Sequence, residues 1–137
     1  MSSTLVRVPM ELAARRVAET APAFPALIAA YLFGSALGLC RRDSDVDLGV
    51  IVQPWGDAAV ADRLEVALGS LEGHPFHVTS LKAESMFAHK VIRGGRLVFS
   101  ADEKARTDFV LRVALQSFYD GPHRRTAERA LREEAGF

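Results

Sequence analysis

Tyr31–Val52, with the sequence YLFGSALGLCRRDSDVDLGVIV, is the stretch that decides the fold of this 137-residue chain. It opens inside a nearly continuous apolar run, Leu27–Phe33, which is typical of a strand buried on both faces. Small and polar residues then fill Gly34–Ser44. Asp45–Val52 follows with an apolar side chain at every second position, which indicates another strand. The stretch therefore predicts two adjacent strands joined by a polar connection.

The remaining sequence predicts helices and strands that extend and cover these two strands. The expected elements are helices at Pro9–Thr20, Asp57–Leu71, Glu84–Ile92, Ser100 to about Tyr119 and His123–Ala135, and strands at Phe76–Leu81 and Arg96–Phe99. Ser100 is expected to cap its helix, because Glu103 follows at the capping-box spacing. This order predicts an α/β (α+β) fold, a small mixed sheet flanked by helices. We expect one domain over residues 1–137, with a core at about 25–120 and a helical tail at 121–137.

Composition excludes several classes of function. Lys and Arg together number 17, as do Asp and Glu, so the formal net charge is zero. Strong nucleic-acid binding is not expected, because it depends on an excess of basic residues. A single cysteine, Cys40, excludes an intrachain disulfide and a cysteine-based zinc cluster. No apolar run approaches the roughly 20 residues that span a bilayer, so we expect a soluble, cytoplasmic protein.

Asp45 and Asp47 lie two residues apart on a predicted strand, so both side chains should point to one face of the sheet. Two carboxylates this close repel each other unless a cation or several hydrogen-bond donors neutralise them. Magnesium suits such a pair, because it prefers oxygen ligands and completes its shell with water and substrate phosphates. The pair therefore predicts a Mg²⁺ site.

Gly34 and Ser35 follow directly where the first buried strand ends. Glycine allows a ligand to approach the backbone closely, and the next amides and the Ser35 hydroxyl can donate to phosphate oxygens. Beside the acidic pair, this turn predicts a site for a metal-bound nucleoside triphosphate. Each element also has an ordinary structural explanation, since Gly-Ser is a common turn and Asp-x-Asp is common on a solvated strand face.

The order of an apolar strand, Gly34-Ser35, the gap Ala36–Ser44 and Asp45-Val46-Asp47-Leu48 resembles the signature of the DNA polymerase β-type nucleotidyltransferase superfamily. The small size of the chain is similar to that of the minimal nucleotidyltransferases (MNT) of bacteria and archaea. Gly95–Phe99 followed by Asp102-Glu103 is similar to a late strand and helix start in those proteins. The similarity covers roughly Pro25–Asp120 and implies the nucleotidyltransferase fold.

The resemblance also implies a reaction and a partner. It implies that Gly34 and Ser35 hold the triphosphate, while Asp45 and Asp47 are catalytic and bind Mg²⁺. It further implies transfer of a nucleoside monophosphate, expected to be AMP from ATP, onto a hydroxyl of a protein or small molecule. Many minimal members are antitoxins to a helical HEPN-type toxin, so such a protein is the expected partner.

The chain departs from the family pattern in the strand Phe76–Leu81. Relatives usually carry a third carboxylate there, but this sequence has no Asp or Glu from Gly73 through Ala83. His77 stands about where that acid is expected, and a neutral imidazole can act as a general base near neutral pH. His77 can equally be a strand residue without a chemical role.

Two hypotheses therefore remain open from the sequence. In the first, the chain is an active magnesium-dependent nucleotidyltransferase, as the intact Gly-Ser and Asp-x-Asp elements indicate. In the second, it keeps the fold but binds and neutralises a partner, such as a HEPN-type toxin, without chemistry, as the missing carboxylate indicates. The sequence identifies neither the nucleotide, nor the acceptor, nor the oligomeric state.

Overall fold

The computed structural model describes residues 5–120. Within this range it contains a five-stranded sheet with the strand order β5-β6-β4-β2-β7 and a separate pair of short strands, β1 and β3. The strands are β1 (Leu5–Arg7), β2 (Leu27–Phe33), β3 (Leu39–Arg41), β4 (Val46–Val52), β5 (Ser70–Leu71), β6 (His74–Ser80) and β7 (Arg96–Ser100). The predicted helix His123–Ala135 and the tail at 121–137 lie outside the described residues.

The five-stranded sheet is mixed. Its central strand β4 pairs antiparallel with β2 on one side and parallel with β6 on the other, and β2 also pairs antiparallel with β7. The antiparallel pairing sets the end of β2 beside the start of β4, with Phe33 opposite Asp47. The parallel pairing sets Asp47 opposite His77 of β6. Both adjacencies lie at the same end of β4.

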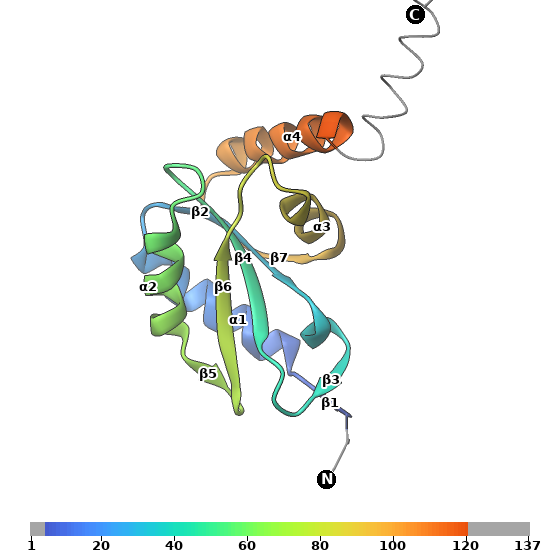
Figure 1. Ribbon diagram of the computed structural model, residues 1–137. Coiled ribbons are helices and arrows are strands. Elements are labelled where there is room, and N and C mark those ends of the chain that lie inside the picture. Colours follow the sequence, from blue (N-terminus) through green and yellow to red (C-terminus); the bar gives the residue numbers. More distant parts are fainter. Residues whose placement is uncertain (1–4, 121–137) are drawn as a thin grey trace, which may run out of the picture.

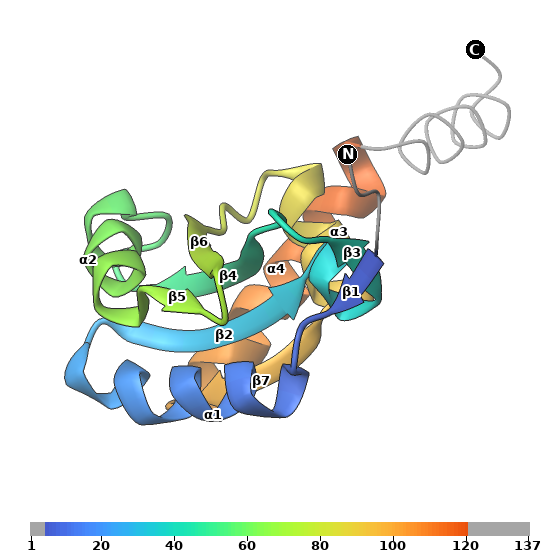
Figure 2. The same cartoon turned by 90° about the horizontal axis from the view of Figure 1, so that it is seen from below.

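Helices cover both faces of the sheet, as Figures 1 and 2 show. They are α1 (Met10–Thr20), α2 (Ala58–Leu68), α3 (Met86–Gly94) and α4 (Glu103–Asp120), with short 3-10 turns at η1 (Ala21–Ala23) and η2 (Ser35–Leu37). Apolar side chains of α1 and α2 join one buried cluster with the sheet, and those of α3 and α4 join a second. The result is a three-layered α/β fold with the sheet in the middle, as expected.

The alternation of β4 assigns its residues to these layers. Val46, Leu48 and Val50 enter the cluster under α1 and α2, whereas Ile51 belongs to the cluster under α3 and α4. Asp47 therefore shares the α3 face of the sheet, because side chains alternate along a strand. Gly49 brings α3 close on this face, since a Cβ at that position would lie 2.9 Å from Val91 Cγ1.

The structure corrects the sequence predictions in a few local details. Strand β4 begins at Val46, so Asp45 immediately precedes it. The predicted Ser100 cap is wrong, because Ser100 is the last residue of β7. Asp102 supplies the capping contact instead, with its Oδ1 accepting from the Ala105 N–H at 3.0 Å. Across the part of the chain that the structure describes, no helix is both long and apolar enough to cross a bilayer.

Candidate functional site

Asp45 and Asp47 lie at the N-terminal end of the central strand β4. The buried side chains of Val46 and Leu48 hold the strand start against the α1 and α2 layer. Asp45 is exposed and Asp47 is half-buried, so both side chains have some contact with solvent. Asp45 lies just before the strand rather than within it, and its charge is close enough to raise the pKa of Asp47. That the two carboxylates share one face as a metal site stays a prediction.

The electrostatics of Asp47 show that its charge is poorly compensated by the protein. Burial raises the pKa of Asp47 above its ordinary value, and the negative charge of Asp45 raises it further, while His77 acts in the opposite direction. Both effects that raise the pKa disfavour the ionised carboxylate. A bound cation would relieve them, so the charge balance at Asp47 fits the predicted Mg²⁺ site.

Two carboxylates are compatible with magnesium, which needs few ligands from the protein. Within residues 5–120 the structure shows no group of three or more His, Cys, Asp or Glu side chains arranged to hold a metal ion. Mg²⁺ is commonly held by one or two carboxylates together with water and substrate phosphates. Asp45 and Asp47 would supply the protein's share, and a triphosphate would supply further oxygen ligands.

Gly34 packs directly against the side chain of Asp47. The sequence suggested this contact only through the expected pairing of the two strands. Its φ of +86° lies in a region that residues other than glycine rarely adopt. A Cβ at this position would lie 2.5 Å from Asp47 Oδ2, well inside van der Waals contact. Ser35 is exposed and begins the turn η2. The start of the turn thus lies against Asp47, and only glycine leaves room for this approach.

His77 lies on the neighbouring strand in register with Asp47. Phe76 and Val78, which flank His77, are buried in the cluster under α1 and α2, so the His77 side chain points to the face that carries Asp47. Its side chain remains 58% exposed and therefore accessible to a ligand. The structure thus places the predicted residues Asp45, Asp47 and His77 together, and their chemical roles stay predictions.

Sequence reasoning missed Glu65 of helix α2, whose side chain contacts strand β6 at His77 and Val78. Its Oε1 accepts a hydrogen bond from the Val78 N–H at 2.7 Å. The same oxygen lies 3.3 Å from His77 Nδ1. No local pattern could reveal this contact, because it depends on how α2 packs against the edge strand β6.

Sequence reasoning also missed His74, a buried histidine at the start of β6 that is 5% exposed. Its Nδ1 lies 2.7 Å from the carbonyl oxygen of Ser44. A carbonyl only accepts, so Nδ1 carries the proton and donates it. The bond fixes the connection immediately before Asp45 and so helps to hold that carboxylate in place.

Replacing His74 with Leu is expected to destabilise the fold by about 1–3 kcal/mol, the usual cost of losing a buried hydrogen bond and leaving one group unpaired. His74→Asn should recover part of this loss, because its amide can donate near the position of Nδ1. Urea unfolding of the two variants measures the difference. Equal stability of the Leu variant and the wild type would show that the bond to Ser44 contributes nothing.

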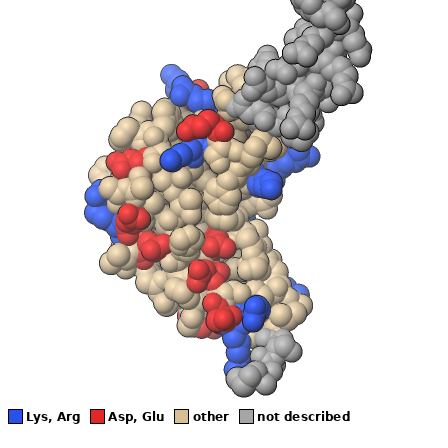
Figure 3. Space-filling model, in the orientation of Figure 1, with Lys and Arg blue, Asp and Glu red and all other residues tan. Residues whose placement is uncertain are grey.

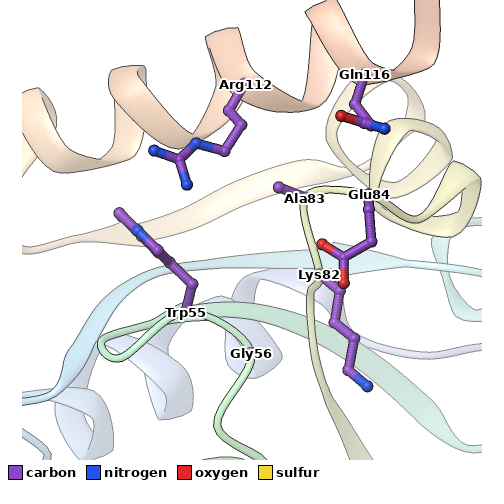
Figure 4. Close-up of a pocket in the computed structure, with 7 residues that line it drawn as sticks. All are labelled: Trp55, Gly56, Lys82, Ala83, Glu84, Arg112 and Gln116. Carbon is purple, nitrogen blue, oxygen red and sulfur yellow. The ribbon is translucent and has the colours of Figure 1, made fainter. Parts of the chain in front are cut away.

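A separate cavity of about 220 Å³ lies near the other end of β4. It is lined by Trp55, Gly56, Lys82, Ala83, Glu84, Arg112 and Gln116 (Figure 4). Trp55 follows the end of β4 and packs against Phe109, with ring centroids 5.2 Å apart. The cavity is therefore distinct from the Asp45/Asp47 site, and the contact with Phe109 favours a packing role for Trp55.

Charged side chains of both signs are interspersed on the face shown in Figure 3. This mixture agrees with equal numbers of basic and acidic residues in the sequence. A strong single-sign field, which attracts a polyanion such as nucleic acid, requires an excess of one charge. That strong nucleic-acid binding is absent stays a prediction from the sequence.

Comparison with protein families gives a match to the model described as "Polymerase beta, Nucleotidyltransferase" over residues 16–104. This range includes the Gly34-Ser35 turn, Asp45, Asp47 and His77. Among curated proteins, none matches the chain.

Solved structures similar to this one include chains from toxin–antitoxin complexes. One is from the tri-AMPylated HEPN toxin of Shewanella oneidensis in complex with MNT antitoxin (19% identity, TM-score 0.58, 93% of this chain and 98% of that chain). A second is from the MntA-HepT complex (18% identity, TM-score 0.58, 93% and 99%). A third is from a toxin–antitoxin structure with AMP-PNP (18% identity, TM-score 0.58, 90% and 98%). At these identities the likeness shows a shared fold.

Proposed function

Because this chain belongs to the polymerase beta nucleotidyltransferase family, we propose that it is a magnesium-dependent enzyme that moves a nucleoside monophosphate onto a hydroxyl group. The expected reaction transfers AMP from ATP, and the acceptor is a protein or small molecule. The structural likeness to a chain from a complex with AMP-PNP supports a triphosphate of adenosine as the donor. Family membership supports the type of reaction. The contact between Gly34 and Asp47 supports the place on the molecule where we propose that it occurs.

One observation carries the proposal: the Gly34 backbone lies against the Asp47 carboxylate with space for no side chain between them. This contact unites a turn that can bind phosphate with a carboxylate that can bind a cation. A structural turn and a solvated acidic strand would not need to meet in this way. The raised pKa of Asp47 supports the same conclusion. Carboxylates whose ionisation is disfavoured by their surroundings are common at functional sites, where a bound ligand can stabilise the negative charge.

The proposed step is a displacement at the α-phosphorus of the triphosphate. The acceptor oxygen forms a bond to that phosphorus, and the bond from phosphorus to the bridging oxygen of the β-phosphate breaks. Pyrophosphate leaves with the electron pair of that bond, and the acceptor hydroxyl gives its proton to His77. Gly34 and Ser35 would hold the phosphates, and Asp45 and Asp47 would hold Mg²⁺. The metal would supply charge stabilisation for the phosphate oxygens.

A HEPN-type helical protein is the proposed partner and acceptor. The structures that share the fold include one of a tri-AMPylated HEPN toxin in complex with MNT antitoxin, which supports both a partner of this kind and AMP transfer to it. A toxin–antitoxin role in the cytoplasm forms part of the same proposal. The similarity spans 93% of this chain and 98% and 99% of the two compared chains.

A second function is favoured by the absence of a carboxylate on β6. His77 stands in register with Asp47, at the position where the family resemblance implies an acid. A chain without a proton acceptor at this position would still keep the fold and could neutralise the partner by binding alone. The two functions predict different results in a labelling experiment.

The experiment incubates the protein with Mg²⁺ and each nucleoside triphosphate, labelled at the α-phosphate, in the presence of a helical protein encoded next to it. Transfer of the α label, without transfer of a γ label, identifies nucleotidyl transfer and its nucleotide. A chelator provides the metal control. Stable complex formation without transfer of label would support the binding function, and absence of both transfer and complex would contradict both.

A further inference from the structure

We propose that Glu65 is a positioning residue that orients His77 toward the acceptor, so that helix α2 supplies the carboxylate that strand β6 lacks. The inference rests on the proposed function, because it assigns a role to Glu65 within the same site. It would explain how a chain without an acid on β6 keeps a competent proton acceptor beside Asp47.

Glu65 is itself held in place by the backbone of β6. Strand β5 pairs with β6 at Pro75 and His74, and the Phe76 N–H donates to the Gly69 carbonyl at 2.9 Å. Val78 is the next position whose N–H faces this edge of β6. The Val78 N–H donates to Glu65 Oε1 at 2.7 Å. A carboxylate that accepts a backbone hydrogen bond loses much of its conformational freedom, and such charge-assisted bonds are among the stronger ones. Glu65 therefore lies at a fixed point on the edge of the strand.

From this point Glu65 reaches the ring of His77. Oε1 lies 3.3 Å from Nδ1, the ring nitrogen nearer the backbone. The contact is an ion-pair distance, and a negative charge beside Nδ1 favours the tautomer with the proton on Nδ1. Nε2 is then left without a proton and is free to accept one. A carboxylate that orients an imidazole in this way is a recurrent device in both metal sites and catalytic triads.

The placement of the two side chains separates their roles. His77 shares the face of the sheet with Asp47, whereas Glu65 projects from α2, which covers the opposite face. Glu65 thus approaches His77 around the edge of β6 rather than from the side of the substrate. The side chain of Glu65 is 38% exposed, less than the 58% of His77. The histidine would meet the acceptor hydroxyl, and the glutamate would act only through the histidine.

The first test measures the tautomer of His77 in the metal-free protein and needs no substrate. Nitrogen-15 chemical shifts of the ring, recorded at about pH 8 where an ordinary imidazole is neutral, distinguish a proton on Nδ1 from one on Nε2. The wild type is expected to hold the proton mainly on Nδ1. In Glu65→Gln, whose amide oxygen is an uncharged and weaker acceptor for both Val78 and His77, the population with the proton on Nε2 should rise. An unchanged tautomer ratio in Glu65→Gln would overturn the proposal.

The matched control is Asp62→Asn, which removes a negative charge from the exposed surface of the same helix. This variant should leave the His77 tautomer as in the wild type. A change in both variants would show that the overall charge of α2, rather than the contact with Glu65, determines the tautomer. That result would also overturn the proposal.

The second test is a double-mutant cycle in the transfer assay. Glu65→Gln is expected to lower kcat by about tenfold to a hundredfold, within the range for groups that orient a functional ligand. His77→Ala should lower it by about a hundredfold or more, as for loss of a general base. In the His77→Ala background, Glu65→Gln should cause no further loss, because its effect passes through the histidine. Independent, additive losses would contradict the proposed coupling.

The two tests separate the failure of this inference from failure of the proposed function. Absence of transfer from the wild-type protein to every acceptor would overturn the proposed function, while the tautomer measurement would still decide whether Glu65 orients His77. Transfer by the wild type, combined with an unchanged tautomer or additive losses, would overturn only the role of Glu65. Thermal unfolding of Glu65→Gln close to that of the wild type would exclude a loss of fold as the cause.

Discussion

Replacing Asp47 with Asn is expected to lower nucleotidyl transfer about a hundredfold to a thousandfold and, in the absence of metal, to stabilise the folded chain. The two effects have the same origin. The carboxylate lies where burial and the charge of Asp45 disfavour ionisation, which a bound cation would compensate. Asparagine keeps nearly the same shape without the charge, so it removes the electrostatic cost together with the proposed metal ligand.

The stability effect has a definite pH dependence. Because the pKa of Asp47 is higher in the folded chain than its ordinary value of 3.8, the folded state holds this proton to a higher pH than the unfolded state does. The folded state therefore binds more protons between the two pKa values, and stability falls as pH rises. The contribution of the protonated group is fully present below the unfolded pKa and is lost as pH rises through the folded pKa.

The measurement is urea unfolding of both proteins in chelator over a pH series that begins below pH 4. The free energy of unfolding of Asp47→Asn should exceed that of the wild type increasingly as pH rises, and then by a constant amount. Asp43→Asn, which changes an exposed aspartate in the same connection, serves as the control and should show little difference. A variant that is less stable than the wild type throughout the series would contradict the electrostatic explanation.

The effect of Asp47→Asn on transfer should be large. Loss of a group that stabilises developing charge commonly lowers kcat by about a hundredfold to a thousandfold. Added Mg²⁺ should stabilise the wild type in the presence of triphosphate and have little effect on the variant, because only a ligand that binds the folded state shifts its stability. Undiminished transfer by the variant would show that Asp47 is not the metal ligand.

The sequence predicts the central part of this fold because its signals are local. Leu27–Phe33 is almost entirely buried, and the alternation in Asp45–Val52 correctly separates the buried valines from Asp47. The strands β1, β3 and β5 were not predicted. Each has three residues or fewer, too few for a periodic pattern. Strands β1 and β3 form by pairing with each other across a long stretch of chain, whereas β5 forms by a tight turn back onto β6.

The same distinction applies to the candidate site. Asp45, Asp47, Gly34 and Ser35 could be predicted because two adjacent strands with the right order bring them together. His77 could be placed by its position on the next strand. Glu65 and His74 could not, because their contacts with Val78 and Ser44 depend on the packing of α2 and on the parallel register of β4 and β6. Residues that support a site from another element leave no local pattern.

Replacing Gly34 with Ala is expected to destabilise the fold and to eliminate triphosphate binding together. The backbone there has φ +86° and ψ −163°, a conformation essentially restricted to glycine. Forcing another residue into it costs about 1–3 kcal/mol. The added methyl would also lie 2.5 Å from Asp47 Oδ2, so the carboxylate must move out of the position in which it could hold a cation.

Gly38 provides a matched control at the other end of the same turn. Its φ of −139° suits any residue, and a Cβ there would meet nothing within 4 Å. Gly38→Ala should therefore leave stability within about 0.5 kcal/mol of the wild type, as is usual for substitutions at open positions. Similar losses in the two variants would show that the turn is sensitive to any added side chain, and would remove the special role of Gly34.

The combination Gly34→Ala with Asp47→Ala separates the two causes of the expected loss. Removing the Asp47 carboxylate takes away the atom with which the new methyl collides, whereas the unfavourable backbone conformation at Gly34 remains. The double variant should therefore be more stable than the sum of the single changes predicts, because neighbouring residues in contact do not act additively. Urea unfolding of the four proteins gives the interaction energy. A value near zero would mean that Gly34 and Asp47 do not press against each other, and the contact that carries the proposed function would be lost.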